Sequence, residues 1–160
     1  GPTAHFSMRD IMLHEEVPDR AAYFRDRSKL AKEGSNDVNA ELILNNFSTR
    51  LGVSVAHILQ ALFDTRRAPD FAYRQVATFH CQRDFIFFRF HRYIFEMAET
   101  PHEIKNAPAN LPITTHIAEL GPRFTLRLVS LHLGAIDSHN AEYVFLRKAR
   151  DTKSRKKWYV

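Results

Sequence analysis

The sequence predicts an α/β fold in which a mixed β-sheet carries helices on one of its faces. Strand-length segments of alternating or continuous apolar character recur along the chain, and two stretches have helical composition or spacing. Hydrophobic residues make up 44% and aromatic residues 12% of the chain, which favours a globular body with a core. A length of 160 residues is typical of a single domain.

The first third of the chain predicts a strand, a helix and a second strand. Residues 3–8 alternate between apolar and polar side chains, and the pattern continues loosely to Leu13. A breaker follows, and residues 20–33 then have helical composition and end at Gly34. Residues 41–47 have the character of a second strand.

A second helix is predicted over residues 50–63, with Ser48 or Thr49 as its N-cap. Its apolar residues recur near the helical period, which indicates one buried stripe. These residues are Leu51, Val55, Ile58, Leu59, Leu62 and Phe63.

The second half of the chain predicts five strands. Residues 74–80 and 84–95 form a hairpin joined by residues 81–83. Both faces of its second strand are mostly apolar, so we expect a central strand that is covered on both sides near its start. Residues 97–112 contain three prolines and form a loop. The remaining strands are expected at residues 113–120, 124–133 and 142–146.

The stretch 118–134 combines a turn with a strand of alternating character. Gly121-Pro122 makes the turn, and we expect it to aim Arg123. A basic face on an otherwise apolar strand needs an acidic partner, and we identify none nearby in sequence. The predicted apolar face consists of Phe124, Leu126 and Leu128. The opposite face consists of Arg123, Thr125 and Arg127, after which Val129, Leu131 and Leu133 are expected to take over.

This stretch closely resembles the signature of the Brix-domain proteins, which are ribosome-assembly factors of eukaryotes and archaea. Residues 74–95, residues 1–6 and residues 44–52 resemble the ribosome production factor 1 branch of that family. The resemblance implies two fused halves that are each like an anticodon-binding α/β module. Residues 1–146 would then be the C-terminal half of a Brix domain, and residues 147–160 a basic C-terminal extension.

The resemblance also implies a function, a place in the cell and a set of partners. It implies a nucleolar, non-enzymatic factor in maturation of the large ribosomal subunit. The expected partners are precursor rRNA, a maintenance-of-killer family protein, other assembly factors and the N-terminal half of the Brix domain. No apolar run approaches the roughly 20 residues that span a membrane, so no membrane partner is expected.

The net charge of +5 favours an anionic partner, and the charge is concentrated near the C-terminus. Residues 147–157 contain seven bases and one acid, and Trp158-Tyr159 follows them. This run is either a solvated extension or a phosphate-binding segment, and its aromatic end either packs on the core or stacks on bases. For Arg89 and Arg92, the alternative to RNA contact is pairing with acids on adjacent strands. The predicted RNA-binding residues are Arg83, Arg89, Arg92, Arg123, Arg127, Arg147, Lys148, Arg150, Lys153, Arg155, Lys156 and Lys157.

Catalytic and metal-binding motifs are absent from the sequence. The nine histidines are scattered without metal-ligand spacing, and neither a Gly-x-Ser-x-Gly nor a Walker-type loop occurs. We therefore expect no enzyme activity, no metal and no cofactor, and we read Cys81 as a buried, inert thiol. The alternatives to RNA binding are a protein–protein scaffold with incidental RNA contact and, from fold kinship alone, a tRNA-synthetase-like anticodon-binding module.

Overall fold

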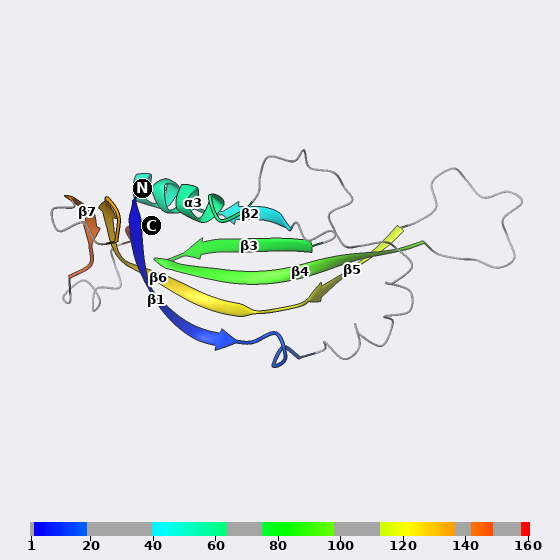
Figure 1. The fold of residues 1–160 in the computed structure, drawn as a ribbon. Coiled ribbons are helices and arrows are strands. Elements are labelled where there is room, and N and C mark those ends of the chain that lie inside the picture. Colours follow the sequence, from blue (N-terminus) through cyan, green and yellow to red (C-terminus); the bar gives the residue numbers. More distant parts are fainter. Residues whose placement is uncertain (1, 19–39, 64–74, 98–112, 137–141, 149–157) are drawn as a thin grey trace, which may run out of the picture.

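The computed structural model describes residues 2–18, 40–63, 75–97, 113–136, 142–148 and 158–160. These residues form a mixed α/β fold with one seven-stranded sheet and the helix α3, which lies over one face of the sheet (Figure 1). The predicted helix at 20–33 and the predicted loop at 97–112 lie largely or wholly outside the described residues. No helix in the described part is long and apolar enough to cross a membrane.

The strands occur close to where the sequence places them. Their order across the sheet is β1-β6-β4-β3-β2, and β5 and β7 pair with β4 and β6. The pairing of β2 with β3 is parallel and every other pairing is antiparallel, as the predicted mixed sheet requires. The strands are β1 (Thr3–Met12), β2 (Glu41–Asn45), β3 (Gln75–Gln82), β4 (Phe85–Met97), β5 (Ile113–Glu119), β6 (Arg123–Leu133) and β7 (Glu142–Leu146).

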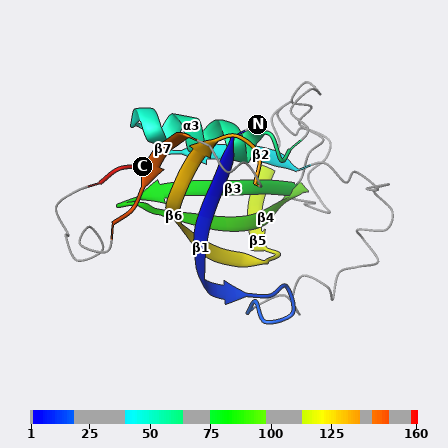
Figure 2. The ribbon, with the colours of Figure 1, turned by 60° about the vertical axis from the view of Figure 1, so that its left-hand side comes forward.

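Strands β4 and β6 each have two neighbours along one edge. The start of β4 pairs with β6, and its later part pairs with β5. Strand β6 pairs with β1 along one edge. Along its other edge, its start pairs with β4 and its end pairs with β7. Figure 2 shows β1 and β6 side by side, running across the direction of β3 and β4. The twisted sheet thereby brings β1 and β6 next to the start of β4.

Helix α3 (Arg50–Gln60) is three residues shorter than predicted, and Thr49 is its N-cap. The Thr49 hydroxyl accepts a hydrogen bond from the Gly52 amide at 2.8 Å, which satisfies one of the unpaired donors of the first turn. Val55 and Leu59 face the sheet from the buried side of the helix.

The core lies between α3 and the sheet. An aromatic row crosses three strands on this face: Phe79 packs against Phe88 with a centroid distance of 4.8 Å, and Phe88 stacks on Phe124 at 4.6 Å. Phe6, Phe47, Phe63, Phe90 and Phe145 are partly buried and pack against the same core. The buried cluster consists of Val55, Leu59, Ala77, Phe79, Cys81, Ile86, Phe88, Leu126, Leu128, Leu131 and Val160.

A bulge in β6 corrects the predicted faces of this strand. The β1 partners shift between His5, which pairs with Ser130, and Phe6, which pairs with Leu128, so Val129 is extra. The side chains beyond it therefore change faces, because alternation restarts one residue later. Leu131 joins Leu128 in the core, instead of continuing the face that carries Arg127.

Candidate nucleic-acid interface

The β3–β4 hairpin turns through Arg83 and Asp84, which both have positive φ (53° and 65°). This two-residue loop has the backbone conformation that matches the twist of paired strands. Arg83 is exposed and its guanidinium lies 5.9 Å from the centroid of Trp158. The Asp84 side chain points inward and is only 2% exposed. The turn thus places a carboxylate inside the protein, where it needs hydrogen-bonding partners.

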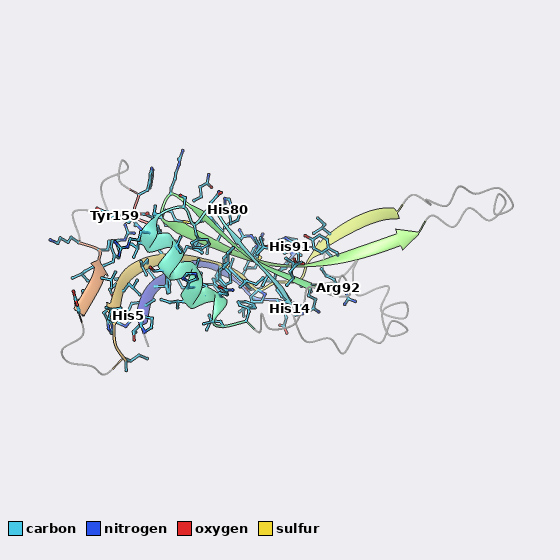
Figure 3. All side chains as sticks on the ribbon, turned by 90° about the horizontal axis from the view of Figure 1, so that it is seen from above. His5, His14, His80, His91, Arg92 and Tyr159 are labelled. Carbon is cyan, nitrogen blue, oxygen red and sulfur yellow. The ribbon has the colours of Figure 1, made fainter. Side chains whose placement is uncertain are left out.

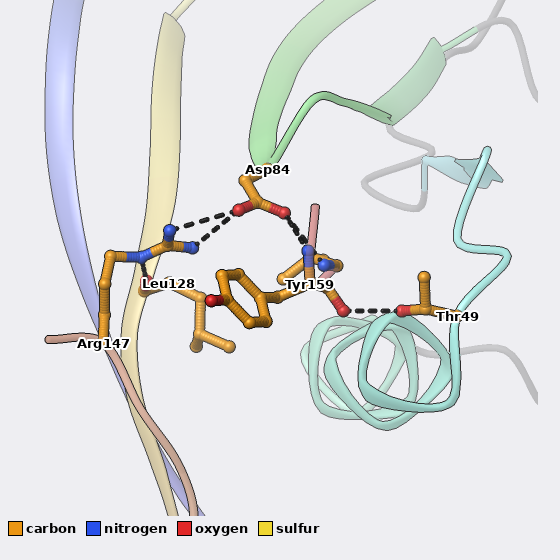
Figure 4. Close-up of polar contacts among 6 residues, drawn as sticks. Thr49, Asp84, Leu128, Arg147 and Tyr159 are labelled. Atoms are coloured by element: carbon orange, nitrogen blue, oxygen red, sulfur yellow. Dashed lines mark hydrogen bonds and ion pairs between the residues drawn. The ribbon is translucent and has the colours of Figure 1, made fainter. Parts of the chain in front are cut away.

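Arg147 supplies the charge that balances Asp84. Its Nη1 and Nη2 atoms each lie 3.1 Å from Oδ2 of Asp84, and its Nε donates to the Leu128 carbonyl at 2.9 Å (Figure 4). The Arg147 side chain is 6% exposed. Arg147, predicted to contact RNA, is thus used in a buried structural ion pair in this structure.

The last residues of the chain complete the Asp84 site. The backbone amides of Tyr159 and Val160 both donate to Oδ1 of Asp84, the second at 3.0 Å. The Thr49 hydroxyl donates to the Tyr159 carbonyl at 2.8 Å (Figure 4), so the N-cap of α3 also holds this end. Val160 lies in the core, whereas Trp158 is 49% exposed. Of the two alternatives for the end of the chain, the structure shows packing on the body, mainly through Tyr159 and Val160 instead of Trp158.

Glu119 is the acidic partner that the basic face of β6 requires. Its carboxylate lies 3.6 Å from Nη1 of Arg123 and 4.0 Å from Nε of Arg89. Arg123 also directs its Nε and Nη2 atoms at the sulfur of Met12, at 3.2 and 2.9 Å. The sequence reading that no acid lies nearby is therefore wrong, because Glu119 is four residues before Arg123. Arg89 on β4 thus lies beside an acid on the adjacent strand β5, at the outer limit of an ion pair, and its contact with RNA stays a prediction.

Gly121 makes the turn that leads into β6. Its φ is +70°, and a β-carbon there would lie 2.6 Å from Cγ2 of Val17. The ring of His14 also hydrogen-bonds to the Leu120 carbonyl, so the segment that follows β1 packs against this turn. Both the backbone angle and the lack of space require glycine at this position.

Arg9, Phe85 and Arg127 meet on the face of the sheet opposite α3. The guanidinium carbon of Arg9 lies 5.3 Å from the centroid of the Phe85 ring, and that of Arg127 lies 5.1 Å from it. The pKa of Arg127 is lowered, first by burial and then by the positive charges of Arg147 and Arg9. Arg89 and Arg123 lie on the same face by strand alternation, which makes this face strongly basic.

The other predicted RNA-binding residues differ in how exposed their side chains are to solvent. Arg92 is buried, at 8% exposure, so its place argues for a structural role. Lys148 is exposed. The remaining predicted residues lie outside the described residues, and they are Arg150, Lys153, Arg155, Lys156 and Lys157.

The described histidines and Cys81 do not come together as a metal site. Figure 3 shows His5, His80 and His91 spread along the sheet, and no group of three or more His, Cys, Asp or Glu among the described residues is placed to hold a metal ion. Burial raises the pKa of the Cys81 thiol to about 11, and the nearby charge of Asp84 acts in the same direction. Cys81 is buried, as predicted.

Comparison with known proteins places this sheet in a family. The model of the Brix domain matches residues 1–130. This chain belongs to the Brix-domain family. It is 43% identical to mouse ribosome production factor 1 over 100% of this chain and 38% of that protein. It is 38% identical to the probable ribosome production factor 1 of Drosophila melanogaster, again over the whole chain and 34% of that protein.

A third relative comes from a fungus. The chain is 42% identical to a Brix domain-containing protein of Schizosaccharomyces pombe, over 45% of that protein. This chain therefore spans less than half the length of the relatives it matches. The identity continues through residue 160, beyond the 1–130 covered by the domain model, which agrees with the packing of Tyr159 and Val160 on the body.

Two important residues of this Brix-domain chain were missed by sequence reasoning. Arg9 lies in a strand whose sequence signal is its apolar alternation, and Asp84 is the first residue of a predicted strand but belongs to the turn before it. An isolated Arg-Asp pair between two apolar strands is a signal for a two-residue turn, and it could have identified the inward-facing carboxylate. No local pattern links Arg9 to Phe85, because the two residues are brought together only by strand order.

Proposed function

We propose that this chain is the RNA-binding part of a non-catalytic ribosome-assembly factor that acts on the precursor of the large ribosomal subunit in the nucleolus. The whole-length similarity to proteins named ribosome production factor 1 supports a role in ribosome assembly. The observation that supports RNA contact is the basic sheet face opposite α3, where Arg89 and Arg123 share the single carboxylate of Glu119. Lysines and arginines would supply affinity through phosphates, and RNA shape would supply selectivity.

The proposed contacts come from two regions. The sheet face supplies Arg89, Arg123 and Arg127, and the β3–β4 turn supplies Arg83. The basic segment at 148–157 supplies Lys148, Arg150, Lys153, Arg155, Lys156 and Lys157. The proposed protein partners are a maintenance-of-killer family protein, other assembly factors and the N-terminal half of the Brix domain.

A salt titration of RNA binding tests this function. If about five phosphates are neutralised, log affinity against log salt concentration should have a slope near −4. Replacing Lys153, Arg155, Lys156 and Lys157 by alanine should weaken binding and reduce the slope by about one unit per lost contact. A flat slope, or no binding at low salt, would remove RNA binding as the primary role.

A protein–protein scaffold is the second candidate, and an apolar edge favours it. Met8, Ile11 and Leu13 are 51%, 56% and 59% exposed, on or just beyond β1. Within the described part of the sheet, one edge of β1 is paired with β6 and the other with no strand. Such an edge accepts a further strand or an apolar partner surface. Retained binding of assembly factors by a chain that does not bind RNA would favour this candidate.

A further inference from the structure

The contact of Arg9 and Arg127 with one phenyl ring brings two positive charges close together. Arg9 belongs to β1 and Arg127 to β6, and Phe85 opens β4. Phe85 is directly opposite Arg127 in the strand register, and Arg9 pairs with Thr125 one step away on the same face. The two guanidinium carbons lie 5.3 Å and 5.1 Å from the ring centroid, which is the distance of a cation–π contact. Three strands thus hold two cations in fixed positions.

Neither cation has an acidic partner among the described residues. Glu119 pairs with Arg89 and Arg123, and Asp84 is enclosed by Arg147 and the two C-terminal amides. The Nε atom of Arg127 is buried and has no hydrogen-bond acceptor in the described structure. The pKa of Arg127 is lowered because burial and the positive charges of Arg147 and Arg9 oppose its charged form, and these effects outweigh the opposite effect of Asp84. Two cations held beside one ring, without an acidic partner among the described residues, favour the binding of an anion between them.

We propose that Arg9 and Arg127, held against Phe85, form a subsite for a phosphate group of the RNA backbone. This inference rests on the proposed RNA-binding function and names the chemistry of one of its contacts. A phosphate offers several acceptor oxygens, so it can accept hydrogen bonds from two guanidinium groups at once, and arginine suits this geometry better than lysine.

The subsite binds the backbone without reading the base sequence. The Phe85 ring already faces two guanidinium groups, which leaves it poorly available for stacking on a base. The specificity of this contact therefore comes from the position of the phosphate on a folded RNA, because phosphate contacts position a nucleic acid but carry no base information.

Charge-neutral substitutions in the chain test the subsite. Arg9→Gln and Arg127→Gln should each lower the affinity for oligouridylate and for a hairpin RNA, and reduce the salt slope by about one unit. Arg50→Gln is the matched control, because Arg50 is an exposed arginine at the start of α3, on the other side of the sheet. It should leave the slope close to that of the parent chain. The loss should be equal for the two RNAs, since no base is read.

Two further variants separate binding from folding. Arg127→Lys keeps the charge but loses the planar set of guanidinium donors that can bind two oxygen atoms at once. It should therefore restore the salt slope that Arg127→Gln loses, and regain only part of the affinity. Phe85→Leu keeps both charges but removes the ring that positions them, so affinity should fall while the slope stays the same. Thermal unfolding of each variant identifies any change that is due to misfolding. Arg9 is exposed on an edge strand, so Arg9→Gln is expected to fold normally.

The outcomes distinguish this inference from the proposed function. If the parent chain binds no RNA, the proposed function fails. If the parent chain binds RNA with a steep salt slope while Arg9→Gln and Arg127→Gln behave like Arg50→Gln, the subsite is refuted and the function stands. Poly-L-glutamate is the competitor that separates the two anion classes. Displacement of RNA from the parent chain by poly-L-glutamate as effectively as by oligouridylate would refute a phosphate site.

Discussion

Asp84 holds four hydrogen-bond donors with two oxygen atoms. One oxygen accepts both terminal nitrogens of Arg147, and the other accepts the amides of Tyr159 and Val160. We expect Asp84→Asn to lower the free energy of unfolding by about 3–5 kcal/mol, because Arg147 would keep a buried charge without its partner. Urea denaturation followed by tryptophan fluorescence and by circular dichroism measures this loss.

The double variant Asp84→Asn/Arg147→Met provides the control for this prediction. Removing both charges should restore part of the stability, since no uncompensated charge then remains in the protein. A double variant that is less stable than Asp84→Asn would mean that Arg147 contributes mainly through packing and through its bond to the Leu128 carbonyl.

The Cys81 thiol gives a prediction about pH. Its pKa rises from 9.0 to about 11 in the folded chain because burial disfavours the thiolate. Between these values the unfolded chain loses the proton and the folded chain retains it. The stabilising contribution is therefore fully present below about pH 9 and is lost as the pH rises toward 11. Unfolding at several pH values should show this decline, and Cys81→Ala should reduce it.

Gly121 should be intolerant of larger residues. Gly121→Val would force a branched residue to a φ of +70° and drive its β-carbon against Val17 and His14. We expect a loss of more than about 2 kcal/mol in unfolding free energy, from backbone strain and overpacking together. Arg123→Ala should lose less stability and chiefly lower RNA affinity. An equal loss of stability in both variants would make Arg123 a structural ion-pair residue.

At the level of elements, Thr49 connects α3 to the C-terminal residues. Its hydroxyl caps the helix and also donates to the Tyr159 carbonyl. Thr49→Ala should cost about 0.5–2 kcal/mol for the lost cap, and the docking of Tyr159 should weaken as well. Thr49→Ser keeps both hydrogen bonds and serves as the control. Thermal unfolding of the two variants measures the difference, and similar stabilities for Ala and Ser would contradict a capping role.

Element positions could be predicted because their signals are local. Strand alternation, the helical spacing at 50–60 and the Thr49 cap are visible within short windows of sequence. The bulge at Val129 could not be predicted in this way, since it depends on the register between β1 and β6. The role of Arg147 depends on Asp84, which is 63 positions away, so the sequence favoured a surface role within a basic run.

At the level of the whole molecule, the free edge of β1 should affect behaviour in solution. Met8, Ile11 and Leu13 are more than half exposed, and exposed apolar edges promote association. We expect the chain to self-associate at high concentration, and Ile11→Lys/Leu13→Lys to make it monodisperse in light scattering. Val53→Lys, on the exposed side of α3, is the control and should not change association. A parent chain that stays monomeric and unfolds cooperatively would contradict this expectation.

The mixed sheet could be predicted as a class, but its strand order could not. Sequence windows do not state that β6 lies between β1 and β4, and this order alone creates the meeting of Arg9, Phe85 and Arg127. The sequence therefore predicts that arginines form the candidate site, but it identifies only some of the arginines that do so. Arg127 was identified from its own strand, whereas Arg9 required the three-dimensional arrangement.

The contacts of Asp84 with Arg147 and with Tyr159 also affect how the chain between them can vary in length. Arg147 and Tyr159 both bind one carboxylate, so the two ends of the chain between them are held close together. The cost of closing a loop grows with the logarithm of its length, so doubling the number of residues adds only about 0.6 kcal/mol. Insertions between the two anchors are therefore cheap, whereas loss of Tyr159 and Val160 removes one anchor completely. Relatives that retain the equivalents of Asp84 and Arg147 are free to lengthen this basic segment without loosening the sheet to which it is attached.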